Sequence, residues 1–163
     1  MRQLLLMRHA ITLDKVPGQT DLERELTLQG QEQALAAGLW LKQQQLTPDL
    51  VLCSPAVRTQ STLAGVLAGL GNSVPVQTER DIYDGEESDL LHLLETADAS
   101  VQTLLFVGHN PTIGYLAQAL TNRRVSFSPA TVLVLTSQKE AVTDGLRNSF
   151  SVTDRFLAPV PRF

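Results

Sequence analysis

The stretch LLLMRHA, residues 4–10, decides the fold of this chain. Its four leading apolar residues have the length and composition of a buried strand, and they run directly into Arg8 and His9. Such a run is typical of a strand covered on both faces, and in open α/β sheets ligands bind at the carboxyl ends of these strands. We therefore expect Arg8 and His9 at a functional edge of a sheet, with an ordinary surface pair at a strand end as the alternative.

Two further apolar runs end in the same way. Residues 50–53 are followed shortly by Arg58, and residues 103–107 lead into Gly108 and His109. Segments with helical periodicity separate the runs, which predicts parallel strands joined by right-handed helical crossovers. Because parallel strands present their carboxyl ends at one edge of the sheet, the three polar clusters are expected to share one cleft.

The predicted fold class is α/β, a three-layer α/β/α sandwich with a mainly parallel central sheet and helices on both faces. Residues 74–77 predict a further short strand, and residues 81–87 predict a polar loop. The last third of the chain predicts β segments at residues 125–127, 131–136 and 150–156, as antiparallel additions to the sheet.

Two helices carry distinct start signals. The helix before the second strand follows Thr27, a good N-cap, and extends over residues 28–45. The helix after the strand at 103–107 has Asn110 as its expected N-cap and Pro111 as its first residue. The first of these helices is predicted to bury a stripe formed by Leu28, Leu35 and Leu39 with Ala34, Gly38 and Leu41 beside them.

The composition indicates one globular domain. The chain has 163 residues, 43% of them hydrophobic, and a formal net charge of −4, which argues against a nucleic-acid or anionic-membrane surface. No apolar run approaches the roughly 20 residues needed to span a bilayer. The single cysteine, Cys53, cannot form an internal disulfide and no secretory signal is visible, so a cytoplasmic location is expected.

The residue types in the three clusters indicate phosphate chemistry. Two converging arginines offer a permanently charged, fork-shaped cradle that suits an anion with several oxygens. A neutral imidazole can attack phosphorus in line and form a phosphohistidine, while a second, protonated histidine donates to the transferring oxygens. We expect one histidine of the cleft to attack and the other to stabilise the developing charge.

At these residues the chain resembles the histidine phosphatase superfamily, also called the phosphoglycerate-mutase-like phosphatases. The resemblance extends over residues 4–120, and the short chain together with the run at 107–111 is most similar to the SixA-type protein phosphohistidine phosphatases. It implies a single histidine-phosphatase domain over residues 1–163 with a phosphoglycerate-mutase-like fold. The matching motifs occur in the family's order, Arg8-His9, then Ser54-Pro55 with Arg58, then Gly108-His109.

The resemblance also implies roles for individual residues. His9 would be the phosphorylated nucleophile, and Arg8, Arg58 and His109 would form the phosphate pocket. Arg24, in the loop that covers the first strand end, would help to bind the phosphate. No metal or organic cofactor is implied.

The chain departs from the family pattern at two places. Many members have glycine at the position of Ala10, so the turn here must be accessible to a residue with a β-carbon. Mutase-like members protonate the leaving oxygen with a glutamate after the third strand, where this chain offers only Asp84 and, as a weaker candidate, Asp81. A phosphoramidate needs less help than an ester because its leaving nitrogen is easily protonated, so the missing acid favours phosphohistidine.

Three functions remain open from the sequence. The first is removal of phosphate from a phosphohistidine of a partner protein, the second is a phosphomonoesterase acting on a small phosphorylated metabolite, and the third is a phosphoprotein-binding module without turnover. A cysteine-nucleophile phosphatase does not fit, because Cys53 and Arg58 are one residue too close and lack glycines between them. A zinc site at His9 and His109 would lack a third ligand.

Overall fold

The structure is a computed structural model that describes residues 1–138 and 145–159. At its centre is a six-stranded sheet with the strand order β3-β2-β4-β1-β5-β6. The strands are β1 (Gln3–Arg8), β2 (Leu50–Cys53), β3 (Val76–Thr78), β4 (Thr103–Gly108), β5 (Val132–Ser137) and β6 (Phe150–Phe156). The helices are η1 (Asp21–Glu23), α1 (Leu28–Gln43), α2 (Val57–Leu70), α3 (Asp81–Asp84), α4 (Glu87–Glu95) and α5 (Thr112–Thr121).

The pairing of the strands brings the three polar clusters to one edge, as the sequence predicts. β4 lies between β2 and β1 and is parallel to both, with Arg8 opposite Gly108 at the end of the ladder. β3 adds to β2 in parallel, whereas β5 and β6 extend the other side in antiparallel orientation. Since β1, β2 and β4 point the same way, the segments that follow them leave the sheet at the same edge.

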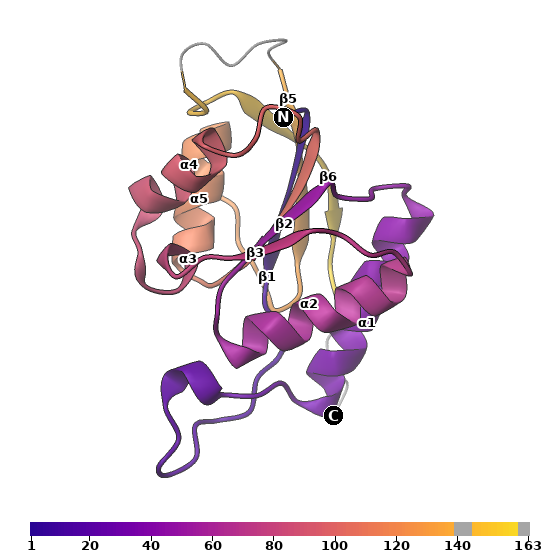
Figure 1. Ribbon diagram of the computed structural model, residues 1–163, viewed down its shortest axis with the longest axis vertical. Coiled ribbons are helices and arrows are strands. Elements are labelled where there is room, and N and C mark those ends of the chain that lie inside the picture. Colours follow the sequence, from indigo (N-terminus) through magenta and orange to yellow (C-terminus); the bar gives the residue numbers. More distant parts are fainter. Residues whose placement is uncertain (139–144, 160–163) are drawn as a thin grey trace.

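Both faces of the sheet are covered, which confirms the three-layer arrangement. Leu4 and Leu6 of β1 pack in a cluster with residues of α4 and α5, and Leu5 and Met7 pack in a second cluster with residues of α1 and α2. All four side chains are fully buried. Figure 1 shows α3, α4 and α5 on one side of the sheet and α1 and α2 on the other. Successive residues of β1 thus face opposite helical layers. Because both faces are buried, the sequence of β1 is a continuous apolar run.

The packing of α1 corrects the stripe predicted for it. Leu28, Leu35 and Leu39 are exposed, and small residues form most of the buried face instead. A β-carbon on Gly38 would lie 2.1 Å from the carbonyl oxygen of Val66 in α2, so the two helix backbones approach too closely for leucines to fit between them. The predicted cap is confirmed, because Thr27 accepts a hydrogen bond from the backbone N–H of Gly30 at 2.9 Å. The buried residues of α1 are Gly30, Gln33, Ala34, Ala37, Gly38 and Leu41.

Two predicted β segments and one predicted loop are also corrected. Residues 125–127 form no strand, because the carbonyl of Phe127 accepts side-chain hydrogen bonds instead of a ladder bond. The third strand lies at Val76–Thr78 rather than at 74–77. The predicted loop at 81–87 contains the short helix α3, whose Ile82 is buried in the core beside α4.

The start of α5 differs from the prediction as well. Pro111, not Asn110, is the N-cap residue, and the helix begins at Thr112. The side-chain amide of Asn110 instead donates to the carbonyl of Phe127 at 3.0 Å, which fastens the loop before β5 to the end of β4. Within the two described ranges, none of the helices has both the length and the hydropathy to cross a bilayer.

Candidate active site

The nucleophile predicted from the sequence lies where β1 leaves the sheet. The backbone N–H of His9 donates to the carbonyl of Gly108 at 3.1 Å, and the carbonyl of His9 accepts from Ala130 N–H at 3.0 Å. These bonds tie His9 to the end of β4 on one side and to the turn before β5 on the other. The backbone that carries the imidazole is therefore fixed from both sides.

One hydrogen bond determines the tautomer of His9. Its Nδ1 lies 2.8 Å from the carbonyl oxygen of Ala10, which can only accept, so Nδ1 carries the proton and Nε2 carries the lone pair. Burial, with the nearby charges of Arg8, Arg58 and Arg24, lowers the pKa of His9 to about 4, although the bond to Ala10 opposes the shift. His9 is thus a neutral imidazole at pH 7 with its reactive nitrogen free to attack.

The turn after His9 needs no glycine. Ala10 is fully buried, and it is not among the described residues with positive φ. Its N–H donates to Thr62 Oγ1 at 3.0 Å, and the hydroxyl of Thr62 in turn donates to the carbonyl of Arg58 at 2.7 Å. The departure from the family pattern at Ala10 is therefore compatible with the backbone, and Thr62 links the turn of the nucleophile to the residue that carries the second arginine.

His109 lies beside His9, with the two ring centroids 5.5 Å apart. Its Nε2 is 2.7 Å from Ser54 Oγ, a hydroxyl that can either donate or accept, so this contact orients the ring in both of its neutral tautomers. Burial, followed by the charge of Arg58, lowers the pKa of His109 to about 3. The sequence predicts a protonated second histidine, whereas in the free protein this imidazole is neutral, and a phosphate dianion beside it would raise its pKa.

Three buried nitrogen atoms of the site have no hydrogen-bond partner among the described residues. They are Nε of Arg8, Nε of Arg58 and Nδ1 of His109. A buried donor without a partner is destabilising by about 1–3 kcal/mol, and two of these groups also carry a positive charge. The two arginine Nε–H groups are unmatched donors in every protonation state, and such donors near His9 suit a ligand with several anionic oxygens.

Both arginines are positioned by groups far away in the chain. Arg8 donates through Nη1 to the carbonyl of Phe127 at 2.8 Å. Arg58 is almost completely buried and donates through Nη1 to the carbonyl of Asp21 at 2.8 Å and through Nη2 to its carboxylate at 3.1 Å. The structure thus brings His9, Arg8, Arg58 and His109 together at the edge predicted for them.

Asp21 and Tyr83 were not predicted from the sequence, yet both contact the site. The hydroxyl of Tyr83 donates to Asp21 Oδ2 at 2.8 Å, and the ring of Tyr83 lies edge-on to His109 with the centroids 5.7 Å apart. The hydrogen bond from Tyr83 and the charge of Arg58 hold the pKa of Asp21 below its ordinary value. The signal available in the sequence was the spacing of Asp21 and Arg24, which places an acid and a base on one turn of the covering loop.

Arg24 lies in the covering loop, close enough to His9 for its charge to lower the pKa of that imidazole, whereas the two acid candidates lie elsewhere. Arg24 donates to Thr12 Oγ1 at 2.7 Å and to the carbonyl of Leu13, so its described contacts hold the covering loop together. Asp81 and Asp84 are both exposed. Asp84 pairs with Arg80 at 2.9 Å on the outside of α3, and no described contact joins either aspartate to the histidines.

Other chemistries find no support at this edge. Cys53 is buried, and burial raises the pKa of its thiol to about 12, which fits its interpretation as a small apolar residue. Across residues 1–138 and 145–159, no three His, Cys, Asp or Glu side chains lie close enough to hold one metal ion.

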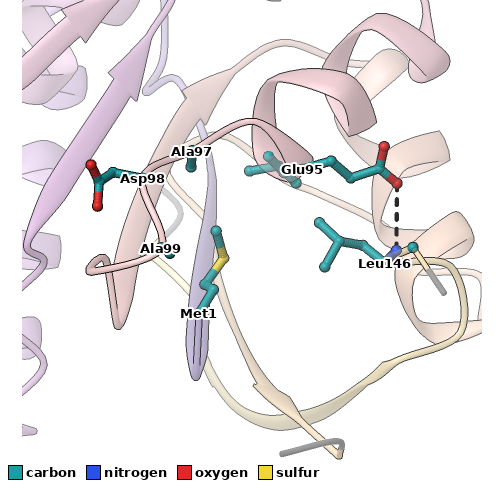
Figure 2. A pocket seen from close by; sticks show the side chains of 8 residues that line it. Met1, Glu95, Ala97, Asp98, Ala99 and Leu146 are labelled. Carbon is teal, nitrogen blue, oxygen red and sulfur yellow. Dashed lines mark hydrogen bonds between the residues drawn. The ribbon is translucent and has the colours of Figure 1, made fainter. Parts of the chain in front are cut away.

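One hollow in the described residues lies away from these side chains. It has a volume of about 600 Å³ and is lined by residues that include Met1, Leu94, Glu95, Asp98 and Leu146 (Figure 2). Met1 precedes β1, so this hollow lies at the opposite end of the sheet from His9 (Figure 1). A second hollow of about 490 Å³ adjoins the site, because Phe127 and Asn110 are among its lining residues.

Comparisons with known proteins agree with the geometry. Residues 4–86 match the family described as the histidine phosphatase superfamily, branch 1. The chain is 31% identical over 145 residues to a phosphohistidine phosphatase SixA homolog of Haemophilus influenzae, an alignment that covers 81% of this chain and 86% of that protein.

Solved structures share the whole fold. The structure of a putative phosphohistidine phosphatase SixA from Nakamurella multipartitia superimposes with a TM-score of 0.83 and 28% identity, covering 98% of this chain and 97% of that one. A protein histidine phosphatase SixA complexed with tungstate superimposes with a TM-score of 0.81, covering 94% and 95% of the two chains. At 22% identity, this last likeness shows the fold alone.

Proposed function

Because the chain belongs to the histidine phosphatase superfamily and is by that membership a phosphatase, we propose that it removes phosphate from a phosphohistidine of a partner protein through a covalent intermediate on His9. Its relative from Haemophilus influenzae is named a phosphohistidine phosphatase SixA homolog. The alternative substrate is a small phosphate ester, and the alternative role is a module that binds phosphoprotein without turnover.

The state of His9 carries the proposal. Its Nδ1 proton is committed to the carbonyl of Ala10, so the lone pair of Nε2 is available, and its pKa of about 4 keeps the ring neutral at pH 7. Near it lie the unmatched Nε–H donors of Arg8 and Arg58 and the unpartnered Nδ1 of His109. A reactive nitrogen beside donors for anionic oxygens is the combination that phosphoryl transfer requires.

In the first step, His9 Nε2 attacks the phosphorus in line with the leaving nitrogen. A bond forms between Nε2 and phosphorus while the bond between phosphorus and the substrate imidazole breaks, and that imidazole takes a proton. Arg8, Arg58 and His109 donate to the three transferring oxygens. In the second step, a water oxygen attacks the phosphorus of the intermediate, the bond to Nε2 breaks, and inorganic phosphate and neutral His9 result.

The acidic residues near the site favour a phosphoramidate over a phosphate ester as the substrate. Asp81 and Asp84 are exposed and outside the site, and the Asp21 carboxyl that does reach it has a lowered pKa. An ionised carboxylate is a poor proton donor, and an alkyl ester needs a good one. The nitrogen of a phosphohistidine is easily protonated by solvent, so it leaves without this help.

A comparison of substrates tests the proposal. Turnover of a phosphohistidine-carrying protein is measured beside a panel of sugar phosphates, and the protein is expected to be the better substrate in kcat/KM. Cleavage of the esters alone would contradict the proposed substrate. A stopped reaction that traps acid-labile phosphate on the protein then separates an enzyme from a binding module, because a module without turnover forms no such label.

A further inference from the structure

The carbonyl and the carboxylate of Asp21 engage the two terminal nitrogens of Arg58, whose Nε has no partner among the described residues. Arg58 offers a fork of two terminal nitrogens, and Asp21 engages both, Nη1 with its main-chain carbonyl at 2.8 Å and Nη2 with Oδ2 at 3.1 Å. Two oxygens of a phosphate would use this same fork. Asp21 therefore presents to Arg58 the pattern of acceptors that a phosphate presents.

The other partners of Asp21 are also donors of the site. Oδ2 accepts from the hydroxyl of Tyr83 at 2.8 Å, and Oδ1 lies 3.5 Å from Nη1 of Arg24. The side chain of Tyr83 adjoins His109, and the Arg58 guanidinium lies 5.9 Å from the centre of its ring. One carboxylate thus holds together an arginine predicted to bind phosphate, a tyrosine beside the second histidine, and the covering loop.

The ion pair between Asp21 and Arg58 is open to solvent on the Asp21 side, so an incoming anion can replace the carboxylate. The side chain of Asp21 is 46% exposed, whereas that of Arg58 is 8% exposed. Asp21 belongs to η1, a three-residue turn in the covering loop, and no residue of this turn is buried. An ion pair that is open to water on one side contributes little to stability, and a phosphate dianion presents twice the charge of Asp21 to the same arginine.

We propose that Asp21 is a positioning residue that stands in for phosphate on Arg58. In the free protein it holds the guanidinium in place. When a substrate phosphate enters, Nη2 of Arg58 passes from the carboxylate to a phosphate oxygen, and when inorganic phosphate leaves, the carboxylate takes the guanidinium back. The inference rests on the proposed function, since it requires that phosphate is a ligand of Arg58.

This role predicts that Asp21 lowers the affinity for substrate phosphate and raises the rate of product release. The negative charge of Asp21 competes with the phosphate, so it weakens substrate binding and speeds the departure of the product. A residue with a merely structural role would have the opposite signature, because its replacement would loosen Arg58 and weaken phosphate binding. The sign of the change in affinity therefore decides between the two roles.

The test is the affinity of the full-length protein for inorganic phosphate and for tungstate, measured by titration calorimetry. Asp21→Asn keeps an oxygen acceptor for Arg58 but removes the charge, and it is expected to bind both anions about tenfold more tightly. Equal or weaker binding would overturn the inference. In turnover, the same variant is expected to lower KM and kcat together, because phosphate departs more slowly.

Two matched variants isolate the cause. Glu23→Gln removes the same charge from the same turn, but the hydrogen bonds of the Glu23 side chain within the described residues all go to Thr20, so the affinity of this variant for phosphate is expected to stay within about twofold of the wild type. Asp21→Glu keeps the charge and is expected to bind phosphate no more tightly than the wild type. An effect of Glu23→Gln equal to that of Asp21→Asn would show that net charge acts alone and would overturn the inference.

The outcomes also separate this inference from the proposed function. If the wild-type protein binds neither phosphate nor tungstate, the proposed function fails and the inference fails with it. If the wild type binds phosphate, Arg58→Lys weakens that binding and Asp21→Asn leaves it unchanged, the phosphate site stands and only the role of Asp21 is wrong.

Discussion

The two ends of the sheet are built from the same strands but differ in what they bury. At the carboxyl ends of β1, β2 and β4, the chain buries arginine and histidine nitrogens that lack partners among the described residues. At the opposite end, beside Met1 and Leu146, lies the hollow of about 600 Å³, which holds neither histidine nor arginine among its described lining residues. In Figure 2 the exposed carboxylate of Glu95 is joined to the backbone of Leu146, a bond of 3.5 Å.

The difference shows that the volume of a hollow does not identify the candidate active site in this fold. The hollow at Met1 is lined by apolar side chains and by the carboxylates of Glu95 and Asp98, which are exposed to water and need no ligand. Buried charged donors without acceptors are destabilising until an anion arrives, and a chain retains them where they serve binding or catalysis. The comparison predicts that substitutions at the first end change activity by orders of magnitude, whereas substitutions at the second change only stability.

The largest effect is expected for the nucleophile. His9→Ala removes Nε2 and with it the covalent route, so kcat should fall by roughly 10⁴-fold or more, with no acid-labile phosphate on the protein. The measurement is single-turnover kinetics with trapping of the phosphoenzyme. Substantial turnover by this variant, or label that maps to another residue, would show that His9 is not the nucleophile.

The next effect concerns the buried guanidinium. Arg58→Lys keeps a positive charge but loses the fork that engages two oxygens, so kcat should fall by about 10²- to 10³-fold. Arg80→Lys is the matched control, because Arg80 is exposed and stacks on the outer side of Tyr83 with its guanidinium 5.3 Å from the ring centre. If both variants lose activity equally, the site tolerates no loss of stacking on Tyr83, and the special role of Arg58 is refuted.

A smaller effect is expected from pH. Burial lowers the pKa of His9 to about 4 and that of His109 to about 3, so between pH 6.5 and 4 the unfolded chain binds more protons at these residues than the folded protein does. Protonation of these histidines in the unfolded chain therefore lowers the free energy of unfolding as the pH falls from 6.5 to 4. Above pH 6.5 both states are neutral at these residues, and the folded protein keeps its full stability. His109→Gln should flatten the fall of Tm with pH by roughly 3 °C or more.

The control for this prediction is the exposed histidine of α4. His92→Gln changes a side chain that lies in water, so the pH dependence of its Tm should follow that of the wild type. An equally steep fall of Tm in His109→Gln and the wild type would mean that the buried histidine is not linked to stability. The activity at substrate concentrations well below KM should stay level from pH 7 to about pH 5, since His9 remains neutral throughout.

The smallest effect is expected at the opposite end of the sheet. Glu95→Gln alters an exposed carboxylate whose described hydrogen bond is long, so the free energy of unfolding should change by about 0.5 kcal/mol or less and kcat/KM should stay constant. Denaturant unfolding and steady-state kinetics measure the two quantities. A loss of activity here would contradict the division of roles between the two ends of the sheet.

Much of the fold was predictable because it depends on local patterns. Apolar runs such as 103–107 mark buried strands, and Thr27 marks a helix start through a contact only three residues long. Where the prediction failed, a distant partner had changed the outcome. Leu28, Leu35 and Leu39 of α1 are exposed because the α2 backbone lies against Gly38. Residues 125–127 form no strand because Arg8 and Asn110 take the carbonyl of Phe127.

The same division holds at the site. By itself the sequence determined that His9, Arg58 and His109 meet, because strands alternating with helices form a parallel sheet and each residue follows a strand. Only the tertiary structure decided that Ser54 orients His109 and that Asp21 holds Arg58 and Tyr83. The physical reason is distance along the chain: Asp21 and Tyr83 are 62 residues apart, and their contact depends on how a loop folds over the sheet, which no local spacing records.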